Sequence, residues 1–237
     1  METPELFGKV MERARLIVQL ARLPVVRLRF EQRLNPDGIR HAHDLFTQPH
    51  PRYKVFRNKT MGIALIDLTR FGGHPGGYLH SVRRDGHAGP QSRKAAARGY
   101  HLRRIDRNDH IDEIHDIHTS CEVRQGRPMD HHYRIRKNVF DDPPHYECYG
   151  VFDAGGRLAA YCSMARYGNF VATNQLMGYK NRDGIMYLLL LKIICHLIEE
   201  RDVDYFMYDT FLGAQPGLRD FKRRVGFRPY RARYELA

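Results

Sequence analysis

The sequence predicts an α/β protein with a mixed sheet. The expected element order is β-α-α-β-β-β-α-β-α-β over residues 99–237, preceded by an N-terminal helical and strand extension. Two observations lead to this prediction. The apolar run 184–191 opens a buried helix, and the apolar segment 204–209 follows it as a strand. A basic amphipathic helix at 217–225 and a last strand at 228–235 complete the series, which is typical of a sheet with a cleft between diverging strands.

The N-terminal part predicts fewer regular elements. Residues 5–23 carry apolar side chains on one helical stripe, and Pro24 ends that helix. Residues 53–56 and 61–68 predict two strands around a polar turn, and the glycines at 72–77 predict a flexible loop. A basic helix follows near 91–98. We treat residues 1–98 as an N-terminal extension or partial lobe, and residues 99–237 as the main domain.

The main domain begins with a strand over 100–105 and two helices over 109–119 and 130–137, of which the second is short and basic. Strands over 146–152 and 158–164 form a hairpin around a turn at 153–156, and a further strand covers 170–177. The helix 185–200 then crosses to the strand 204–209, and the right-handed crossover places it on one face of the sheet. The opening at the start of this helix is the predicted ligand site.

Positive charge is concentrated in two parts of the chain. The net charge is +12 over 237 residues. Residues 81–104 hold seven Arg or Lys residues against one Asp, and residues 219–234 hold seven against Asp220. Each window therefore carries a charge of +6, and the two together equal the net charge of the chain. Such concentration indicates a polyanionic partner: nucleic acid, a phosphorylated cofactor or an anionic membrane surface. The alternative is a basic protein with solvated faces.

The remaining composition narrows the class of protein. Four cysteines without a CxxC pair argue against a zinc ribbon or a disulfide framework and fit a reducing cytoplasm. The N-terminus lacks a signal-peptide pattern, and the apolar stretch 184–198 is shorter than the ~20 residues that span a bilayer. We therefore expect a soluble, cytoplasmic protein with no membrane partner. The histidines form no closed ligand pattern, so no metal site is expected, and His115 and His118 are expected on the surface of their helix.

From residue 99 onward the series resembles the GNAT acyltransferase superfamily. The segment Phe221-Lys222-Arg223-Arg224-Val225-Gly226-Phe227 is similar to the FK…GF ending common in that family. GNAT enzymes bind the pyrophosphate of acetyl-CoA at a Q/R-x-x-G-x-G/A turn that opens a helix. By this resemblance the donor-binding turn is Asn181-Arg182-Asp183-Gly184-Ile185-Met186. Asn181 stands at the Q/R position and Met186 at the last G/A position, so the turn departs from the family pattern at both ends. This weakens the signal for coenzyme A, although the positive charge of Arg182 could partly compensate.

A second resemblance indicates another donor. The segment Ser92-Arg93-Lys94-Ala95-Ala96-Ala97-Arg98-Gly99 resembles the basic helix of Fem-type aminoacyl transferases, GNAT-fold enzymes that take an amino acid from aminoacyl-tRNA and form an amide bond. The resemblance gives Lys222, in the FK pair, a role at the 3′ end of the donor or at the developing oxyanion. It implies aminoacyl-tRNA as co-substrate, with acyl-CoA as the alternative, and no tightly bound cofactor. The residues assigned to tRNA are Arg83, Arg84, Arg93, Lys94, Arg98, Arg219, Arg223 and Arg224.

Amide formation from an activated ester needs a deprotonated amine, a hydrogen-bond donor for the oxyanion and accurate placement of the reactants. Asp209, at the end of the strand 204–209, is the candidate that accepts the amine proton directly or through water. A turn or N-cap aspartate before Thr210 is the alternative reading of that residue. Tyr208 is the other catalytic candidate. The two side chains alternate along the strand, so only one of them is expected to face the cleft.

The loop 121–129, between the first two helices of the main domain, carries Arg124, Gln125 and Arg127. In the GNAT layout this loop borders the acceptor side. Two arginines with a glutamine could hold a carboxylate or phosphate through forked hydrogen bonds, and a solvated basic loop is the alternative. The acceptor is expected to be a small-molecule or peptide amine.

Three functions remain open from the sequence. The first is an acyltransferase that moves an aminoacyl group from tRNA to an amine. The second is an acetyl- or acyl-CoA-dependent N-acyltransferase, and the third is a non-catalytic GNAT-like module that binds RNA. The two basic windows, the altered turn 181–186 and the two Fem-like segments favour the first.

Overall fold

The structure is a computed structural model that describes residues 18–50, 57–84, 86–124 and 127–237. Its first elements are β1 (Val25–Phe30), α2 (Pro36–Thr47), β2 (Met61–Asp67), α3 (Pro75–Arg84) and α4 (Ala88–Ala97). Next come β3 (His101–Arg104), α5 (Ile111–Thr119), the short strands β4 (Val123–Arg124) and β5 (Arg127–Pro128), and α6 (His131–Arg134). The last are β6 (Tyr146–Phe152), β7 (Leu158–Arg166), β8 (Phe170–Gly178), α7 (Ile185–Glu200), β9 (Tyr205–Thr210), α8 (Pro216–Val225) and β10 (Arg228–Leu236).

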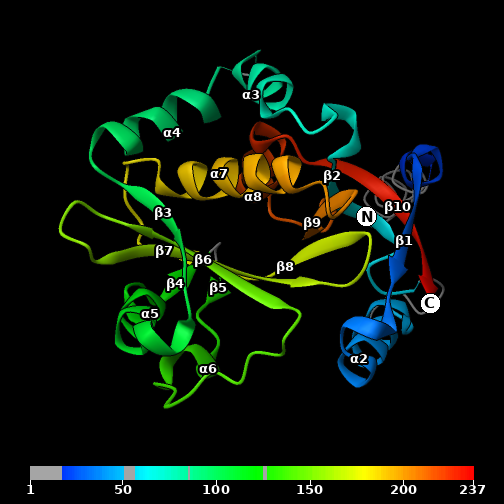
Figure 1. Ribbon diagram of the computed structural model, residues 1–237, viewed down its shortest axis with the longest axis horizontal. Coiled ribbons are helices and arrows are strands. Elements are labelled where there is room, and N and C mark those ends of the chain that lie inside the picture. Colours follow the sequence, from blue (N-terminus) through cyan, green and yellow to red (C-terminus); the bar gives the residue numbers. More distant parts are fainter. Residues whose placement is uncertain (1–17, 51–56, 85, 125–126) are drawn as a thin grey trace, which may run out of the picture.

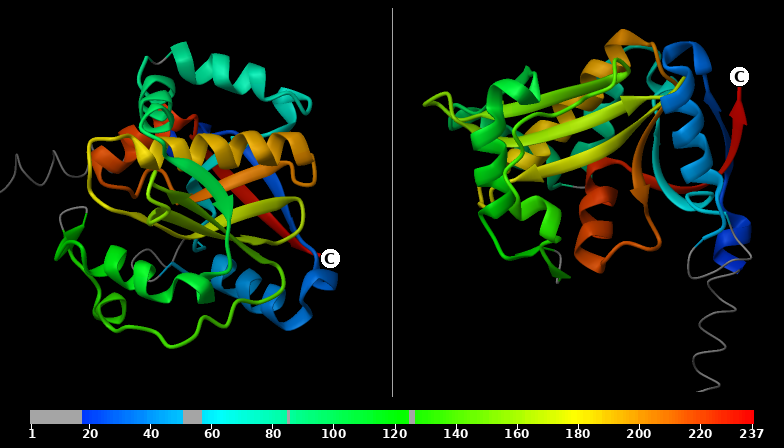
Figure 2. Two further views of the ribbon diagram at one scale, coloured as in Figure 1. Left: turned by 60° about the vertical axis from the view of Figure 1, so that its left-hand side comes forward. Right: turned by 90° about the horizontal axis from the view of Figure 1, so that it is seen from below.

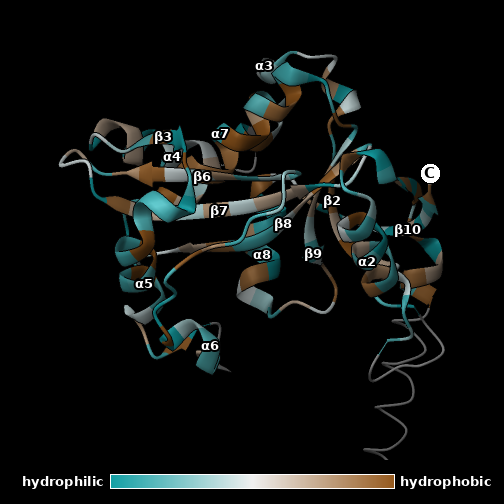
Figure 3. Ribbon diagram, turned by 60° about the horizontal axis from the view of Figure 1, so that its bottom comes forward, coloured by the Kyte–Doolittle hydropathy of each residue, from teal (hydrophilic) through white to brown (hydrophobic). Residues whose placement is uncertain are grey.

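The predicted order of the main domain is confirmed. Helix α7 begins and ends at the predicted residues, and the strands from β3 to β10 that were expected lie within two residues of their predicted limits. The helix is apolar along much of its length (Figure 3). Gly184 precedes it with a φ of +84°, a backbone conformation that favours glycine, so the local sequence marks where the helix begins.

One mixed sheet of eight strands runs through the described residues, in the order β1-β10-β2-β9-β8-β7-β6-β3 (Figure 1). β1 pairs with β10 and β8 pairs with β9 in parallel, while the other neighbours are antiparallel. β2 lies between β10 and β9, so the sheet joins strands from both sides of residue 98. The β8–α7–β9 crossover forms at its centre, where it positions the site described below.

Helices cover both faces of the sheet (Figure 1). α3, α4 and α7 lie over one face, and α5 and α6 lie over the other. The largest core cluster packs α7 with α3, α4 and the end of α8 against the central strands. A second cluster forms around Phe30 and Phe170 next to α2, and a third forms around Ile114 and Tyr161 beneath α5.

The flexible loop predicted at 72–77 is wrong for its second half. Helix α3 begins at Pro75 and includes Gly76 and Gly77. Tertiary packing overrides the low helix propensity of the glycines, because Tyr78 and Val82 are buried in the largest core cluster. The hydroxyl of Tyr78 also donates a hydrogen bond to the carbonyl at position 225, at 2.8 Å.

Other differences lie in the N-terminal third and in α6. β1 and α2 were not predicted, and the helix expected at 130–137 is the single turn α6. Residues 18–22 of the predicted helix 5–23 are helical, and the rest of that helix, like the predicted strand 53–56, falls outside the described residues. In the described ranges, no helix has the length and hydropathy needed to cross a membrane.

Candidate active site

The site lies where two parallel strands separate. β8 and β9 pair only from Phe170↔Tyr205 to Ala172↔Met207, although both strands continue beyond these pairs. Helix α7 follows β8 after the turn 179–184, and α8 follows β9. The diverging strand ends and the two helix N-termini therefore surround one opening, as in other open α/β sheets.

A cavity of about 950 Å³ fills this opening. Its walls come from the end of β8, the turn 179–184 with the start of α7, the first half of α8, the helix α4, and residues within 121–124 and 128–133. Figure 2 shows α8 and the α5–α6 region as two separate groups of helices near the strand ends. The charged lining is mostly basic: Lys94, Arg124, Lys180 and Arg182 stand against Asp130 among the described lining residues. This charge favours an anionic or electron-rich ligand.

Helix α4 and the start of β3 hold the turn 179–184 in place. Lys94 Nζ donates to the carbonyl of Arg182 at 2.8 Å. The hydroxyl of Tyr100 donates to Asp183 Oδ2 at 3.0 Å, and Arg98 forms an ion pair with the same carboxylate. The basic helix near 91–98 therefore contacts the predicted donor turn directly.

The backbone of this turn approaches α4 most closely at Gly184. A Cβ at this position would lie 2.3 Å from the carbonyl oxygen of Gln91, so the packing of α4 against the turn requires glycine. On the cavity side, the Met186 side chain packs across Gly178, where an added Cβ would lie 2.9 Å from its Sδ. Met186 thus fills space at the start of α7.

Lys222 lies behind the cavity wall and is 1% exposed. Its Nζ donates to the carbonyl oxygens of Tyr208 and Thr210 at 2.7 Å each. These residues follow the last β8–β9 pair, so the lysine supplies hydrogen bonds to β9 where β8 has moved away. Nζ also lies 4.1 Å from the centroid of the Tyr208 ring. Burial lowers the pKa of Lys222 to about 8.

Of the two catalytic candidates on β9, Tyr208 faces the cavity. Within the described residues its hydroxyl has no hydrogen-bond partner, and burial raises its pKa well above the ordinary value, so it is a neutral donor. Asp209 does not line the cavity. It has a φ of +49°, its side chain is 54% exposed, and it pairs with Lys59 at 3.2 Å.

The pH dependence of stability tests the burial of Lys222. Its pKa is 10.5 when unperturbed and about 8 in the folded protein. Between these values the unfolded state binds more protons, so the stability contributed by Lys222 rises with pH in that window and is lost as the pH falls through 8. We expect the wild type to gain about 2 kcal/mol relative to Lys222→Met between about pH 7 and pH 9.5. Urea unfolding of both proteins measures this, and the same pH dependence in both would refute it.

Comparison with solved structures shows which known proteins have a similar fold. No protein-family model matches the sequence, and no curated protein matches it. Among solved structures, FemX is similar with a TM-score of 0.52 and 12% identity, over 71% of this chain and 59% of that one. The chain has a GNAT-like fold.

Two further structures are similar at lower TM-scores. L-PGS from Bacillus licheniformis has a TM-score of 0.43 and 15% identity, over 71% of this chain and 59% of that one. A GCN5-related N-acetyltransferase from Kribbella flavida has a TM-score of 0.38 and 12% identity, over 56% of this chain and 48% of that one. The chain therefore spans 59% or less of the length of these three structures.

In this GNAT-like fold, most of the predicted donor turn lines the cavity. The lining residues are Asn181, Arg182, Gly184, Ile185 and Met186. Asp183 is not among them, because its carboxylate is engaged by Arg98 and Tyr100. Asn181 Oδ1 accepts a hydrogen bond from the Asp183 amide at 3.1 Å, so this side chain stabilises the turn. Their roles in donor binding stay predictions.

Of the predicted acceptor residues, Arg124 lines the cavity. Gln125 and the side chain of Arg127 lie outside what the structure describes. The guanidinium of Arg124 donates to the carbonyls of Gly178 at 3.0 Å and Ile117 at 2.8 Å, and its buried Nε has no partner among the described residues. Arg124 thus connects the end of β8 to the end of α5 and keeps one N–H group uncommitted.

The residues predicted to bind tRNA lie in separate parts of the molecule. Lys94 lines the cavity, while Arg98 is paired with Asp183. Arg83 and Arg93 both approach Gly89, near the junction of α3 and α4.

The side chain of Arg84 is not among those that the structure describes. The other residues predicted to bind tRNA belong to α8. Arg223 and Arg224 both pair with Asp220, at 2.6 and 2.7 Å, and line a second pocket. Arg219 is half-buried on the same helix. Binding of tRNA by these residues stays a prediction.

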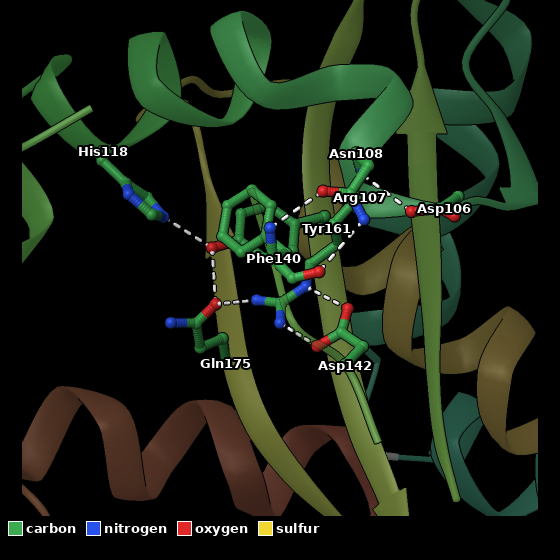
Figure 4. A network of polar contacts seen from close by, with 8 residues as sticks. All are labelled: Asp106, Arg107, Asn108, His118, Phe140, Asp142, Tyr161 and Gln175. Atoms are coloured by element: carbon green, nitrogen blue, oxygen red, sulfur yellow. Dashed lines mark hydrogen bonds and ion pairs between the residues drawn. The ribbon is translucent and has the colours of Figure 1, made fainter. Parts of the chain in front are cut away.

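A buried polar network that the sequence did not predict lies on the face covered by α5 (Figure 4). Arg107, which is 7% exposed, binds the Asp142 carboxylate through Nε at 2.7 Å and through Nη2. Its Nη1 donates to Gln175 Oε1 at 2.9 Å, and the Tyr161 hydroxyl donates to the same oxygen at 3.1 Å. His118 Nε2 lies 2.6 Å from that hydroxyl.

The surface position predicted for His118 is wrong. The residue is 6% exposed, and burial lowers its pKa to about 4, so the ring is neutral at physiological pH. Because Tyr161 gives its one hydroxyl hydrogen to Gln175, the hydrogen between His118 and Tyr161 belongs to Nε2. In the described residues, no group of three or more His, Cys, Asp or Glu could hold a metal ion.

The network reaches the cavity through Gln175 and Tyr133. The Tyr133 ring lies 4.9 Å from the ring of His118, and both Tyr133 and Gln175 line a small pocket beside the network. Among the described residues the Tyr133 hydroxyl donates no hydrogen bond, so its hydrogen remains available to a ligand. Tyr133 lines the cavity, and burial raises its pKa, so it is a second neutral donor at the wall.

The sequence held one signal for this network. Tyr161 and Gln175 are polar groups within strands that are otherwise largely apolar, and a buried polar group requires a partner. The identity of the partners could not be predicted, because Arg107 and Asp142 are distant in sequence and meet them only through the fold.

Proposed function

We propose that this protein transfers an aminoacyl group from aminoacyl-tRNA to an amine acceptor and forms an amide bond. The observation that carries the proposal is the turn 181–186 at the cavity. Met186 fills space at the start of α7, where a GNAT pyrophosphate turn has a small residue. Lys94, Lys180 and Arg182 surround the same end of the cavity and favour a large polyanion. The FemX-like fold and the two Fem-like segments support the same donor.

In the proposed reaction, the amine nitrogen attacks the carbonyl carbon of the aminoacyl ester. A C–N bond forms and the C–O bond to the ribose breaks, while the amine loses a proton and the ribose oxygen gains one. We assign the oxyanion contact to Tyr208, which is neutral and uncommitted at the wall. Aminoacyl esters are reactive, so placing the two reactants correctly supplies much of the rate.

Lys222 serves as a positioning residue in this proposal. Its ammonium holds the backbone on both sides of Asp209 and lies beneath the Tyr208 ring, so it restricts where the hydroxyl points. Asp209 receives the amine proton only through water, because it pairs with Lys59 outside the cavity.

Transfer is tested with tRNA charged with radiolabelled amino acids and a panel of small-molecule and peptide amines. We expect labelled amide to form from charged tRNA and to disappear when the donor is first treated with ribonuclease. Acyl-CoA offered to the same amines is the comparison. Product from acyl-CoA that ribonuclease does not affect, with none from charged tRNA, would reject the proposal. Salt-sensitive tRNA binding without product would favour the non-catalytic RNA-binding module.

An acyl-CoA-dependent N-acyltransferase is the second candidate, and the start of α7 favours it. Ile185 and Met186 bring the first turn of the helix to the cavity, and Arg182 lies next to them. This function predicts that micromolar coenzyme A raises the Tm and that Arg182→Glu removes the increase. A Tm that no acyl-CoA changes would exclude this candidate.

Tyr133 gives a prediction for the acceptor side of the cavity. Its free hydroxyl hydrogen makes it a candidate donor to the acceptor, so Tyr133→Phe is expected to raise KM for the amine roughly fivefold, the loss of one ordinary hydrogen bond. The kcat and the Tm should change little. Steady-state kinetics with varied amine concentration measures the effect, and a change in kcat with constant KM would assign Tyr133 to the chemical step instead.

A further inference from the structure

A second pocket lies near the C-terminal end of α8. It has a volume of about 510 Å³ and is lined by Gly86, His87, Arg223, Arg224 and Arg228. The first two residues come from the connection between α3 and α4, and the arginines come from the end of α8 and the start of β10. We call it the arginine pocket.

Arg223 and Arg224 share one carboxylate. Asp220 pairs with Arg223 at 2.6 Å and with Arg224 at 2.7 Å. Two guanidinium groups against one carboxylate leave this trio with a net positive charge. The Arg223 side chain is 63% exposed and that of Arg224 is 34% exposed, so both remain accessible to a ligand.

The surroundings add to the positive potential. Arg228, at the start of β10, donates through Nη1 to the carbonyls of Arg223 and Phe227 at 2.9 and 3.0 Å. His87 is the N-cap residue of the ten-residue helix α4 and makes no side-chain cap. The positive end of the α4 dipole therefore opens at the same pocket as the arginines.

The arginine pocket adjoins the main cavity through two rings. His87 lines both spaces, and its ring lies 5.2 Å from that of Tyr187, which lines the main cavity. Arg224 lies near enough to Tyr187 for its positive charge to oppose the rise that burial causes in the pKa of that phenol. One elongated ligand could therefore occupy the main cavity and reach the arginines past these rings.

We propose that the arginine pocket is a phosphate subsite for the donor. The acyl end of the donor lies in the main cavity, and a phosphate group of the same molecule binds Arg223 and Arg224. The proposal rests on the proposed function, since it takes the main cavity to be the place where the acyl group reacts. A phosphate ester suits forked guanidinium groups, which bind phosphate through paired hydrogen bonds. Both tRNA and coenzyme A carry such a group.

The test measures the binding of uncharged tRNA and of coenzyme A at several salt concentrations. The double variant R223Q/R224Q is compared with the wild type and with Arg233→Gln, which removes one exposed charge farther along β10. We expect the double variant to bind tRNA roughly tenfold more weakly. Its slope of log affinity against log salt should fall by about 1 for each phosphate that the variant no longer neutralises. Arg233→Gln should stay close to the wild type.

Asp220→Asn provides a variant with the opposite expectation. It releases Arg223 and Arg224 from their ion pairs, so tRNA should bind more tightly and with a steeper salt slope. A gain in affinity cannot be imitated by misfolding.

The outcomes separate this proposal from the proposed function. The subsite would be overturned if R223Q/R224Q and Asp220→Asn both bound tRNA and coenzyme A with the affinity and the salt slope of the wild type. This would hold even if transfer from tRNA were observed. Weaker binding of coenzyme A alone in the double variant would support a phosphate subsite and make coenzyme A its source, and the tRNA donor would then fail.

Discussion

Replacing Gly184 with alanine is expected to lower the free energy of unfolding by roughly 3 kcal/mol. Its φ of +84° costs an L-residue about 1–2 kcal/mol. The new Cβ would also lie 2.3 Å from the Gln91 carbonyl oxygen, which belongs to α4. Because a backbone atom cannot move aside as a side chain does, relief of this contact must shift α4 away from the donor turn.

Gly156→Ala is the matched control for this change. Gly156 has nearly the same φ, +81°, and nothing within 4 Å of an added Cβ among the described residues. It should lose only about 1 kcal/mol, the cost of the backbone conformation. Urea unfolding of both variants measures the difference, and equal losses would show that α4 does not pack against Gly184 as closely as described.

Tyr208→Phe is expected to lower kcat for transfer about 100-fold, the usual cost of losing one oxyanion donor. The KM values and the Tm should stay close to those of the wild type, because the hydroxyl has no hydrogen-bond partner among the described residues. The phenol stays neutral, so the loss should be similar across the physiological pH range.

Tyr205→Phe is the control on the same strand. Tyr205 is half-buried against the cluster around Phe30 and does not line the cavity, so kcat should not change. Single-turnover kinetics of both variants separates the chemical step from product release. A Tyr208→Phe enzyme with wild-type kcat would remove Tyr208 from the mechanism.

The sequence predicted the centre of the fold well because its signals there are local. The apolar run of α7 begins after Gly184, whose positive φ marks the helix start, and strands with clear apolar patterns flank it. The turn 181–186 could be located for the same reason, since it opens that helix, and its role in donor binding stays a prediction. The choice between Tyr208 and Asp209 needed the structure, because alternation along a strand shows that the two differ and not which one faces the cavity.

The errors arose where distant contacts decide the outcome. Gly76 and Gly77 favour a loop by propensity, yet burial of Tyr78 in the main core keeps α3 helical. His118 looked like a surface residue until the fold placed Tyr161 against it. The resemblance gave Lys222 a role at the 3′ end of the donor or at the oxyanion. Its burial and its hydrogen bonds to β9 became visible only when β8 and β9 were seen to separate.

Native mass spectrometry tests the identity of the donor most directly. The protein is purified without nuclease and then mixed with equal concentrations of charged tRNA and acetyl-CoA. We predict a complex whose added mass is that of one tRNA, and loss of the aminoacyl mass from that tRNA when an accepted amine is added. A complex whose added mass is that of coenzyme A, with no tRNA bound, would contradict transfer from tRNA.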